Sequence, residues 1–219
     1  MDIIATFPKR LFISLDRRAD RRTKLLPRLA AAGLTADWLK AIDGRVLREA
    51  RGYMSLSKRA NALSKRLAIR AACLAGADAV LIFEDDVTFH PQFAERVSAL
   101  TLPADWGMFY FGCLHREPPQ RVSPGIVRAS RCFDHHAFAI RREHFHTVRK
   151  RMRGWGKKAN GRLHSDVLVS DLHKTIPTYA AYPNLAWQAE EFSDLADRSY
   201  SNYRPDGTQK LWGGMLAHL

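Results

Sequence analysis

The chain has few cysteines and no long apolar stretch. Its three cysteines, Cys73, Cys113 and Cys132, are too few and too scattered for a disulfide framework or a zinc knuckle. An odd number of thiols favours a reducing compartment. No apolar run approaches the roughly 20 residues that cross a bilayer, and Met1 to Lys9 lack the apolar core of a signal peptide. We therefore expect a cytoplasmic protein, at most peripheral to the inner face of the membrane.

Several sequence signatures are also missing. The chain contains no internal repeat, no low-complexity tract and none of the Gly-x-x-x-x-Gly-Lys, Gly-x-Gly-x-x-Gly or Gly-x-Ser-x-Gly motifs. Acidic residues are scarce: 22 stand against 35 basic ones, which gives a net charge of +13 with neutral histidines. Such a surface attracts polyanions, namely nucleic acid, an anionic membrane or a phosphorylated glycan.

The pattern of apolar residues predicts alternating strands and helices. We expect strands at 10–15, 38–42, 79–83, 106–112, 137–140 and 178–182, and helices at 20–32, 57–75, 141–152 and 165–173. Asp20 is a candidate N-cap and Gly33 a stop for the first helix, in which Pro27 implies a bend or a later start. Residues 154–161 are a candidate mobile flap. The 219 residues thus suit one α/β domain with a mostly parallel sheet and helices on both faces.

Three consecutive acids follow the most apolar of these strands. In open α/β sheets ligands gather at the carboxyl ends of strands, where Glu84-Asp85-Asp86 is expected to lie. Adjacent carboxylates repel one another unless a cation neutralises them, and oxygen ligands suit Mg²⁺ or Mn²⁺. Glu84 and Asp86 point the same way if strand geometry persists, which makes them the candidate metal pair. The alternative is a helix cap or a loop cluster of acids.

Other polar residues are weaker candidates. Asp16 follows the first strand and can hydrogen-bond a ribose, while Arg17 and Arg21 can reach phosphate; a helix cap with solvated arginines explains them equally well. Asp166 is a candidate general base for an acceptor hydroxyl. Three histidines stand open as a third metal ligand: His136, His164 and His173.

Four stretches together resemble glycosyltransferase family 25, the lipooligosaccharide and collagen galactosyltransferase group. Residues 12–21, FISLDRRADR, are similar to the family's opening INLDRRPDR segment, and residues 40–44, KAIDG, to its AIDG segment. ALS at 62–64, followed by LIFEDDV at 81–87, resembles its ALSH and LILEDDV block. Tyr182-Pro183, Gln188 and Ser193-Asp194 resemble its tail. Order and spacing agree over roughly residues 10 to 195, which is more specific than any single motif.

This resemblance implies a GT-A-like, Rossmann-like fold over residues 1–195, with 196–219 as a C-terminal extension that forms a lid or a tail. It also implies transfer of a hexose, galactose or glucose, from a nucleotide-diphosphate sugar, a UDP-sugar in our expectation, with inversion. Mn²⁺ or Mg²⁺ would lie at Glu84 and Asp86, and Asp166 would act as the base. The matching positions for donor binding are Leu15, Asp16, Arg17, Arg21, Asp43, Lys65 and Asp85. Lys65 replaces the family's histidine but can still contact a phosphate.

The expected acceptor is a cell-surface glycan or its lipid-linked precursor, with the basic surface held at an anionic membrane or a phosphorylated glycan. One alternative keeps the transferase but places the sugar on a modified base in nucleic acid, as the net charge suggests. Another is a non-catalytic module that binds glycan or nucleic acid. The acidic triplet disfavours the non-catalytic module, because a protein that only binds glycan or nucleic acid does not need three adjacent carboxylates that repel one another.

Overall fold

The structure is built on one large, mixed sheet. The computed structural model describes residues 3–51, 55–153, 164–193 and 198–210, so the predicted flap at 154–161 lies outside the described residues. In spatial order the eight strands are β2 (Asp37–Lys40), β1 (Lys9–Ser14), β3 (Ala79–Glu84), β10 (Ala137–Arg141), β5 (Met108–Tyr110), β11 (Thr178–Ala181), β8 (Ile126–Arg128) and β7 (Gln120–Ser123).

Most strands of this sheet point the same way. The pairs β1–β2, β1–β3 and β5–β11 are parallel, whereas β10 is antiparallel to both of its neighbours, β3 and β5. β8 also runs against β11 and β7. The expected mostly parallel α/β sheet is therefore confirmed, with β10 and β8 as reversed strands within it.

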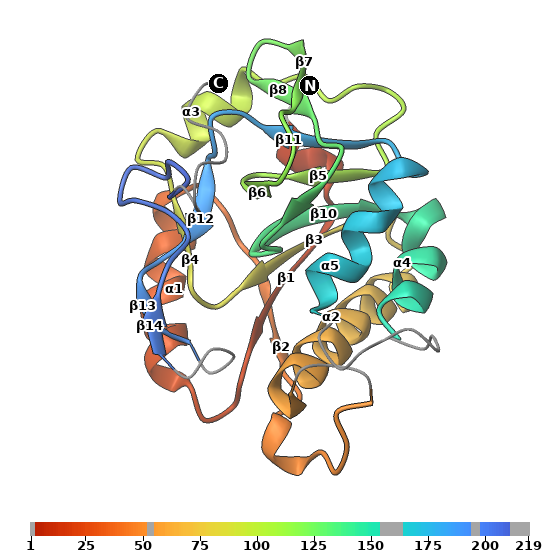
Figure 1. Ribbon diagram of the computed structural model, residues 1–219. Helices are drawn as coiled ribbons and strands as arrows, with labels where there is room; N and C mark the ends of the chain where they lie inside the picture. Colours follow the sequence, from red (N-terminus) through yellow and green to blue (C-terminus); the bar gives the residue numbers. More distant parts are fainter. Residues whose placement is uncertain (1–2, 52–54, 154–163, 194–197, 211–219) are drawn as a thin grey trace.

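Helices cover both faces of the sheet, as the sequence predicts (Figure 1). They are α1 (Ala19–Ala31), α2 (Leu56–Leu74), α3 (Phe93–Ser98), α4 (Phe145–Arg151) and α5 (Ser165–Ser170). Short 3-10 helices occur at Ile3–Thr6, Gly44–Val46, Arg142–His144 and Asp171–Lys174. Smaller ladders join β4 (Val87–Phe89) to β12 (Ala186–Gln188), β6 (Leu114–His115) to β9 (Cys132–Phe133), and β13 (Glu191–Ser193) to β14 (Arg198–Tyr200).

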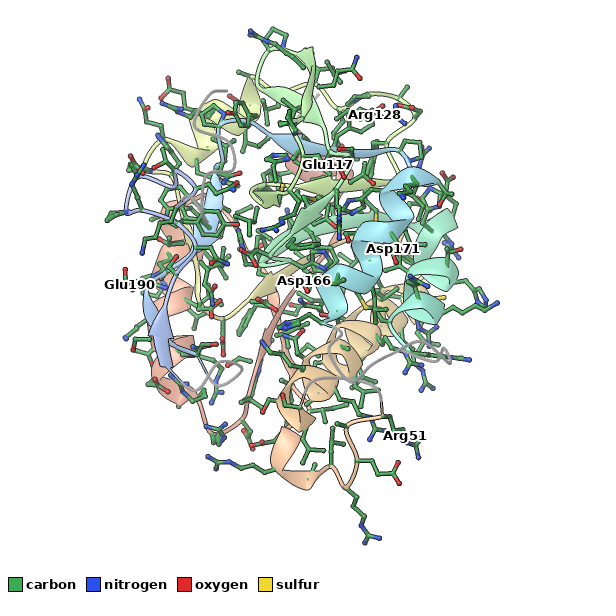
Figure 2. The ribbon with its side chains drawn as sticks, viewed as in Figure 1. Arg51, Glu117, Arg128, Asp166, Asp171 and Glu190 are labelled. Carbon is green, nitrogen blue, oxygen red and sulfur yellow. The ribbon has the colours of Figure 1, made fainter. Side chains whose placement is uncertain are left out.

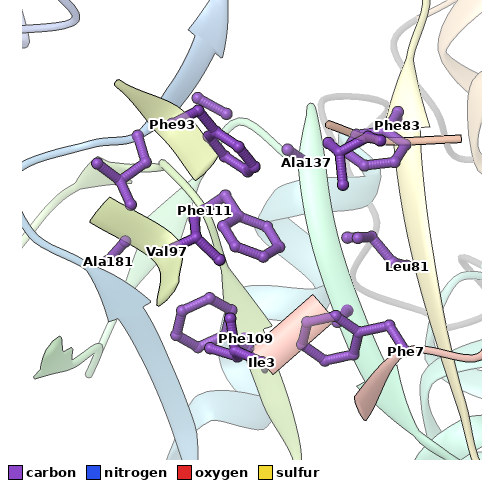
Figure 3. Packing of buried hydrophobic residues seen from close by; sticks show 14 of the residues in the cluster. Ile3, Phe7, Leu81, Phe83, Phe93, Val97, Phe109, Phe111, Ala137 and Ala181 are labelled. Carbon is purple, nitrogen blue, oxygen red and sulfur yellow. The ribbon is translucent and has the colours of Figure 1, made fainter. Parts of the chain in front are cut away.

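The alternation of side chains along β3 divides the core in two. Leu81 and Phe83 face α1 and α3, while Val80 and Ile82 face α2 and α4. All four side chains are fully buried, which is why the strand's sequence is continuously apolar. Figure 3 shows the aromatic part of the first core, in which Phe111 packs edge-on against Phe109 with ring centroids 5.1 Å apart. Burial on both faces positions the end of β3 rigidly.

The first helix differs from the sequence prediction at its start. It begins at Ala19 with Arg18 at the N-cap position, so the prediction of Asp20 as the cap is wrong: the Asp20 carboxylate accepts hydrogen bonds from the Arg18 guanidinium instead. The helix continues through Pro27, which is exposed, so water can satisfy the carbonyl that lost its partner. Gly33 ends the helix in the left-handed conformation (φ 69°), as predicted.

No helix in the described part of the chain combines the length and apolar character that crossing a membrane requires.

Residues 198–210 lie against the rest of the molecule. Tyr203 is buried there, and its hydroxyl donates to Asp134 Oδ2 at 3.2 Å.

The approach of β12 to the end of β5 generates a prediction about Gly112. A Cβ at this position would lie 1.7 Å from the carbonyl oxygen of Ala186, so Gly112→Ala should destabilise the fold by about 3 kcal/mol or more. Gly76→Ala is the control, because Gly76 has φ 68° but open space around it, and should cost only about 1 kcal/mol. Urea unfolding measures both. Equal losses would show that the backbone contact at Gly112 does not constrain the fold.

Candidate active site

A pocket opens at the carboxyl ends of β1, β2 and β3. We call it the donor pocket, after the donor-binding positions that the sequence resemblance implies; its lining comprises Ile13, Ser14, Leu15, Arg17, Arg21, Ala41, Ile42, Asp43, Gly44, Ser57, Ala60, Asn61, Ser64, Glu84, Asp85, Asp86, Gln188 and Ser193. Segments far apart in the sequence meet here because parallel strands end at the same edge. Small residues on one side of α2 leave room for the pocket. Gly44 packs so closely on Ser57 that a Cβ would lie 2.9 Å from its backbone.

The strand geometry of β3 ends at Glu84, and the two acids that follow have a different basic partner from Glu84. Arg21 of α1 is buried and donates through Nη1 to Asp85 Oδ1 at 2.6 Å and Asp86 Oδ2 at 3.4 Å. Glu84 instead pairs with buried Lys65 of α2 at 2.9 Å and accepts from Asn61 Nδ2 at 2.9 Å. Two basic side chains of the protein thus form direct ion pairs with three carboxylates.

Glu84 and Asp86 have pKa values shifted in opposite directions, because their electrostatic surroundings differ. Burial raises the pKa of Asp86 to about 7, and the neighbouring charge of Glu84 adds to this effect. Burial acts in the same direction on Glu84, but the charge and hydrogen bond of Lys65 outweigh it and hold the pKa of Glu84 below its ordinary value. Oδ2 of Asp86 accepts from Gln188 at 3.0 Å, whereas its buried Oδ1 has no hydrogen-bond partner among the described residues. An orphaned carboxylate oxygen is a position that a cation can satisfy.

Of the other predicted donor residues, three line the pocket and two do not. Leu15 and Arg17 line it, and Arg17 Nε donates to Asp43 Oδ2 at 2.9 Å. Asp43 also caps the 3-10 helix at Gly44–Val46 by accepting from the N–H of Arg45. Asp16 lies outside the donor pocket, on the adjoining exposed surface, where it pairs with Lys40 at 2.7 Å. Lys65 lies beneath Glu84 and does not line the pocket.

Asp166 stands in the first turn of α5 (Figure 2). Its neighbour Ser165 donates to Asn61 Oδ1 at 3.1 Å, and Asn61 in turn donates to Glu84, which connects the start of α5 to the donor pocket. Burial lowers the pKa of Lys58 on α2, while the negative charges of Asp166 and Glu84 act in the opposite direction. The ammonium group of Lys58 therefore lies within electrostatic range of both carboxylates.

Asp134 forms a second acidic centre that the sequence pattern did not indicate. Its backbone N–H donates to Asp166 Oδ2 at 3.3 Å, and its own Oδ2 accepts from Asn202 at 2.8 Å and from Tyr203. Burial, followed by the charge of Asp166, raises the pKa of Asp134 to about 7. Asp134 adopts φ 64°, a left-handed conformation that aspartate tolerates better than most residues.

The histidines left open as a third metal ligand have other surroundings. His136 is buried with Nε2 3.1 Å from the carbonyl oxygen of Ala186, and His173 is buried with Nε2 3.1 Å from the hydroxyl of Tyr110. Burial lowers the pKa of each to about 4, which keeps both neutral. His164 precedes α5 and is half-buried. In the part of the chain that the structure describes, no three histidine, cysteine or acidic side chains are grouped to hold a metal ion.

Comparison with known proteins gives partial matches in sequence. No protein-family model matches the chain. A glycosyltransferase 25 family member from Aedes aegypti is 28% identical over an alignment of 122 positions, covering 46% of this chain and 20% of that protein. A second member, from Anopheles gambiae, is 27% identical, covering 46% and 21%. These matches confirm the resemblance to family 25. The alignment spans about a fifth of the length of the curated relatives.

The fold also has a counterpart among solved structures. A mutant of Drosophila β-1,4-galactosyltransferase 7, solved in complex with manganese, UDP-Gal and xylobiose, aligns with 94% of this chain and 76% of its own. The TM-score is 0.50 at 16% sequence identity. This similarity supports the expected GT-A-like fold.

The raised pKa of Asp134 generates a prediction about stability and pH. Between about pH 4 and pH 7 the folded state keeps a proton on Asp134 that the unfolded state releases, so this group's contribution to stability falls as pH rises through 7. Asp134→Asn keeps an acceptor for Asn202 but does not ionise. Relative to the unmodified protein, the variant should therefore gain about 2 kcal/mol between pH 5 and pH 8.

Thermal unfolding of both proteins across this pH range measures the effect. Asp78→Asn is the matched control, because the Asp78 side chain is 92% exposed and the substitution should give a constant difference at every pH. A constant difference for Asp134→Asn as well would mean that Asp134 does not hold a proton in the folded state near neutral pH.

Proposed function

We propose that the protein is a glycosyltransferase that moves a hexose, galactose or glucose, from a UDP-sugar to a hydroxyl group of a cell-surface glycan or its lipid-linked precursor, with inversion. The observation that carries the proposal is the donor pocket, which brings Arg17, Arg21 and Asp43 together with the acidic triplet at the ends of three parallel strands. The similarity to family 25 members and the GT-A-like fold support it.

The pocket offers suitable groups for each part of a nucleotide-diphosphate sugar. Arg17 lines the open side, where a guanidinium can bind a diphosphate through two parallel hydrogen bonds. Asp43 lies at the same mouth and provides a carboxylate for ribose hydroxyls. Arg21 is committed to Asp85 and Asp86, so we assign to it the task of holding these acids in place rather than of reaching the donor.

The residues present fit a divalent cation. Glu84 and Asp86 would hold Mn²⁺ or Mg²⁺, since both provide hard oxygen donors and the Oδ1 atom of Asp86 is buried without a hydrogen-bond partner in the described part of the chain. When bound, the metal would supply positive charge that stabilises the leaving diphosphate. Lys65 and Asn61 orient Glu84 for this role.

Asp166 is the proposed base. The backbone N–H groups of Asp134 and Val167 donate to its two carboxylate oxygens, which fixes the side chain and leaves lone pairs to accept the proton of an acceptor hydroxyl. Residues 198–210 meet this region through Asn202 and Tyr203, so we place the acceptor between α5 and this segment.

Binding of the donor nucleotide tests the proposal directly. UDP should raise the thermal unfolding midpoint in the presence of Mn²⁺ more than GDP, ADP or CMP does, and EDTA should abolish the increase. A ligand at 100 times its dissociation constant stabilises the native state by about 2.7 kcal/mol. Asp86→Asn should remove the metal-dependent shift without loss of fold, because it replaces a buried carboxylate whose ionisation is already disfavoured.

The exposed Asp78→Asn variant is again the matched control and should keep the full shift. A shift that is equal for all four nucleotides, or that survives both EDTA and Asp86→Asn, would contradict a metal-dependent UDP site at the triplet.

Turnover tests the role of Asp166 separately. Asp166→Asn should lower the rate of transfer at saturating donor by about 100-fold or more, as expected for loss of a general base. The UDP shift should remain, because Asp166 does not line the donor pocket. Sugar transfer to an acceptor and the thermal shift are measured on the same preparation. Unchanged turnover would remove Asp166 from the chemistry and leave the donor site standing.

A further inference from the structure

A second pocket lies on the other side of α2 from the donor pocket. We call it the basic pocket; its lining comprises Arg51, Arg59, Leu63, Arg66, Lys150, Met152 and Arg153. It lies where α2 packs against the end of α4, and Arg51 marks its position in Figure 2. The residues that α2 turns toward the donor pocket, such as Asn61 and Ser64, are on the opposite flank of the helix.

Of the seven described residues that line the basic pocket, five are basic and none is acidic. They come from three separate segments: the loop before α2, the middle of α2 and the end of α4. Like charges that converge in this way repel one another. Glu49, which pairs with Arg51 at 2.9 Å, offsets part of this charge. The convergence of basic side chains from three segments favours a ligand of opposite charge at this place.

Local structure accounts for only part of this charge. Lys150 stands in the last turn of α4, where a cation interacts favourably with the helix dipole. That effect does not involve Arg51, Arg59 or Arg66, which belong to other segments.

Contacts with Glu49 hold two of the arginines at the pocket wall. Arg51 Nε donates to the Glu49 carboxylate at 2.9 Å, and Arg59 Nη1 donates to the Glu49 carbonyl at 2.5 Å. A guanidinium has five N–H donors, so each of these side chains retains further donors for a ligand. Glu49 thereby holds Arg51 and Arg59 in place before a ligand binds.

We propose that the basic pocket binds a phosphate group, carried either by the headgroup of an anionic membrane lipid or by a phosphorylated glycan. Guanidinium groups match phosphate oxygens in charge and geometry, and convergence from three sides suits a compact dianion. Leu63 and Met152 add an apolar surface beside the charges. The site is separate from the donor pocket, so binding there does not depend on the proposed transferase activity.

The test compares two double variants that change the net charge equally. Lys150→Glu with Arg153→Glu alters exposed residues of the basic pocket. Arg121→Glu with Lys174→Glu alters exposed residues outside it. Inorganic pyrophosphate in EDTA is the first probe, measured by calorimetry. The pocket variant should bind it about tenfold more weakly than the unmodified protein, while the control variant should remain within about twofold.

Vesicles and duplex DNA then distinguish the source of the phosphate. Binding to phosphatidylcholine vesicles that contain phosphatidylglycerol, but not to phosphatidylcholine alone, with loss only in the pocket variant, supports a lipid headgroup. Pyrophosphate binding without vesicle binding supports a phosphorylated glycan. Equal weakening in both double variants would overturn the proposal, since net charge alone would then explain binding. A pocket-dependent affinity for duplex DNA without pyrophosphate binding would also overturn it, in favour of a nucleic-acid surface.

Discussion

The buried ion pairs at the end of β3 are the interaction on which the candidate site depends. Arg21 and Lys65 are inside the protein, and each meets a carboxylate within 3 Å. Removing one partner of such a pair leaves an uncompensated charge in a poorly solvated place, which typically costs 3–5 kcal/mol. Because Arg21 belongs to α1 and Lys65 to α2, these contacts also fix the two helices to opposite sides of one strand end. The site and the packing of the domain are therefore stabilised by the same groups.

Much of this arrangement could be predicted from the sequence because it follows from local patterns. The unbroken apolar run at 79–83 indicates a strand buried on both faces, and the helical spacing of apolar residues between 57 and 75 indicates α2. Parallel strands end at one edge of a sheet, which is where the acidic triplet was expected to lie. The resemblance to family 25 implied the donor-binding positions. Leu15, Arg17, Arg21, Asp43 and the acidic triplet do line one pocket. Asp16 and Lys65 lie just outside it, because their side chains point to Lys40 and to the interior.

The remainder depended on contacts between distant segments. No sequence pattern reveals that Asp134 takes a left-handed conformation, or that its carboxylate meets Asn202 and Tyr203 almost 70 residues later. The position of β10 was predicted at 137–140, but its reversed direction was not, for a similar reason: local apolar spacing gives a strand's position but not its direction or its neighbours. The helical spacing of Asn61 and Lys65 was available as a signal, since residues four apart share a helix face and both reach Glu84.

Helix α2 connects the separate parts of the molecule. One flank carries Asn61 and Lys65, which hold Glu84, and the opposite flank carries Arg59 and Arg66 of the basic pocket. Lys58, in its first turn, lies in the field of both Asp166 and Glu84. Helix α2 has 19 residues and is anchored by buried Lys65. Because the helix is rigid, the residues on its two flanks keep fixed positions relative to one another. If a phosphate-bearing molecule occupies the basic pocket, its position relative to the acidic triplet is set by this helix. Under the two proposals made above, the distance between the bound phosphate and the proposed acceptor hydroxyl would then be fixed by the protein.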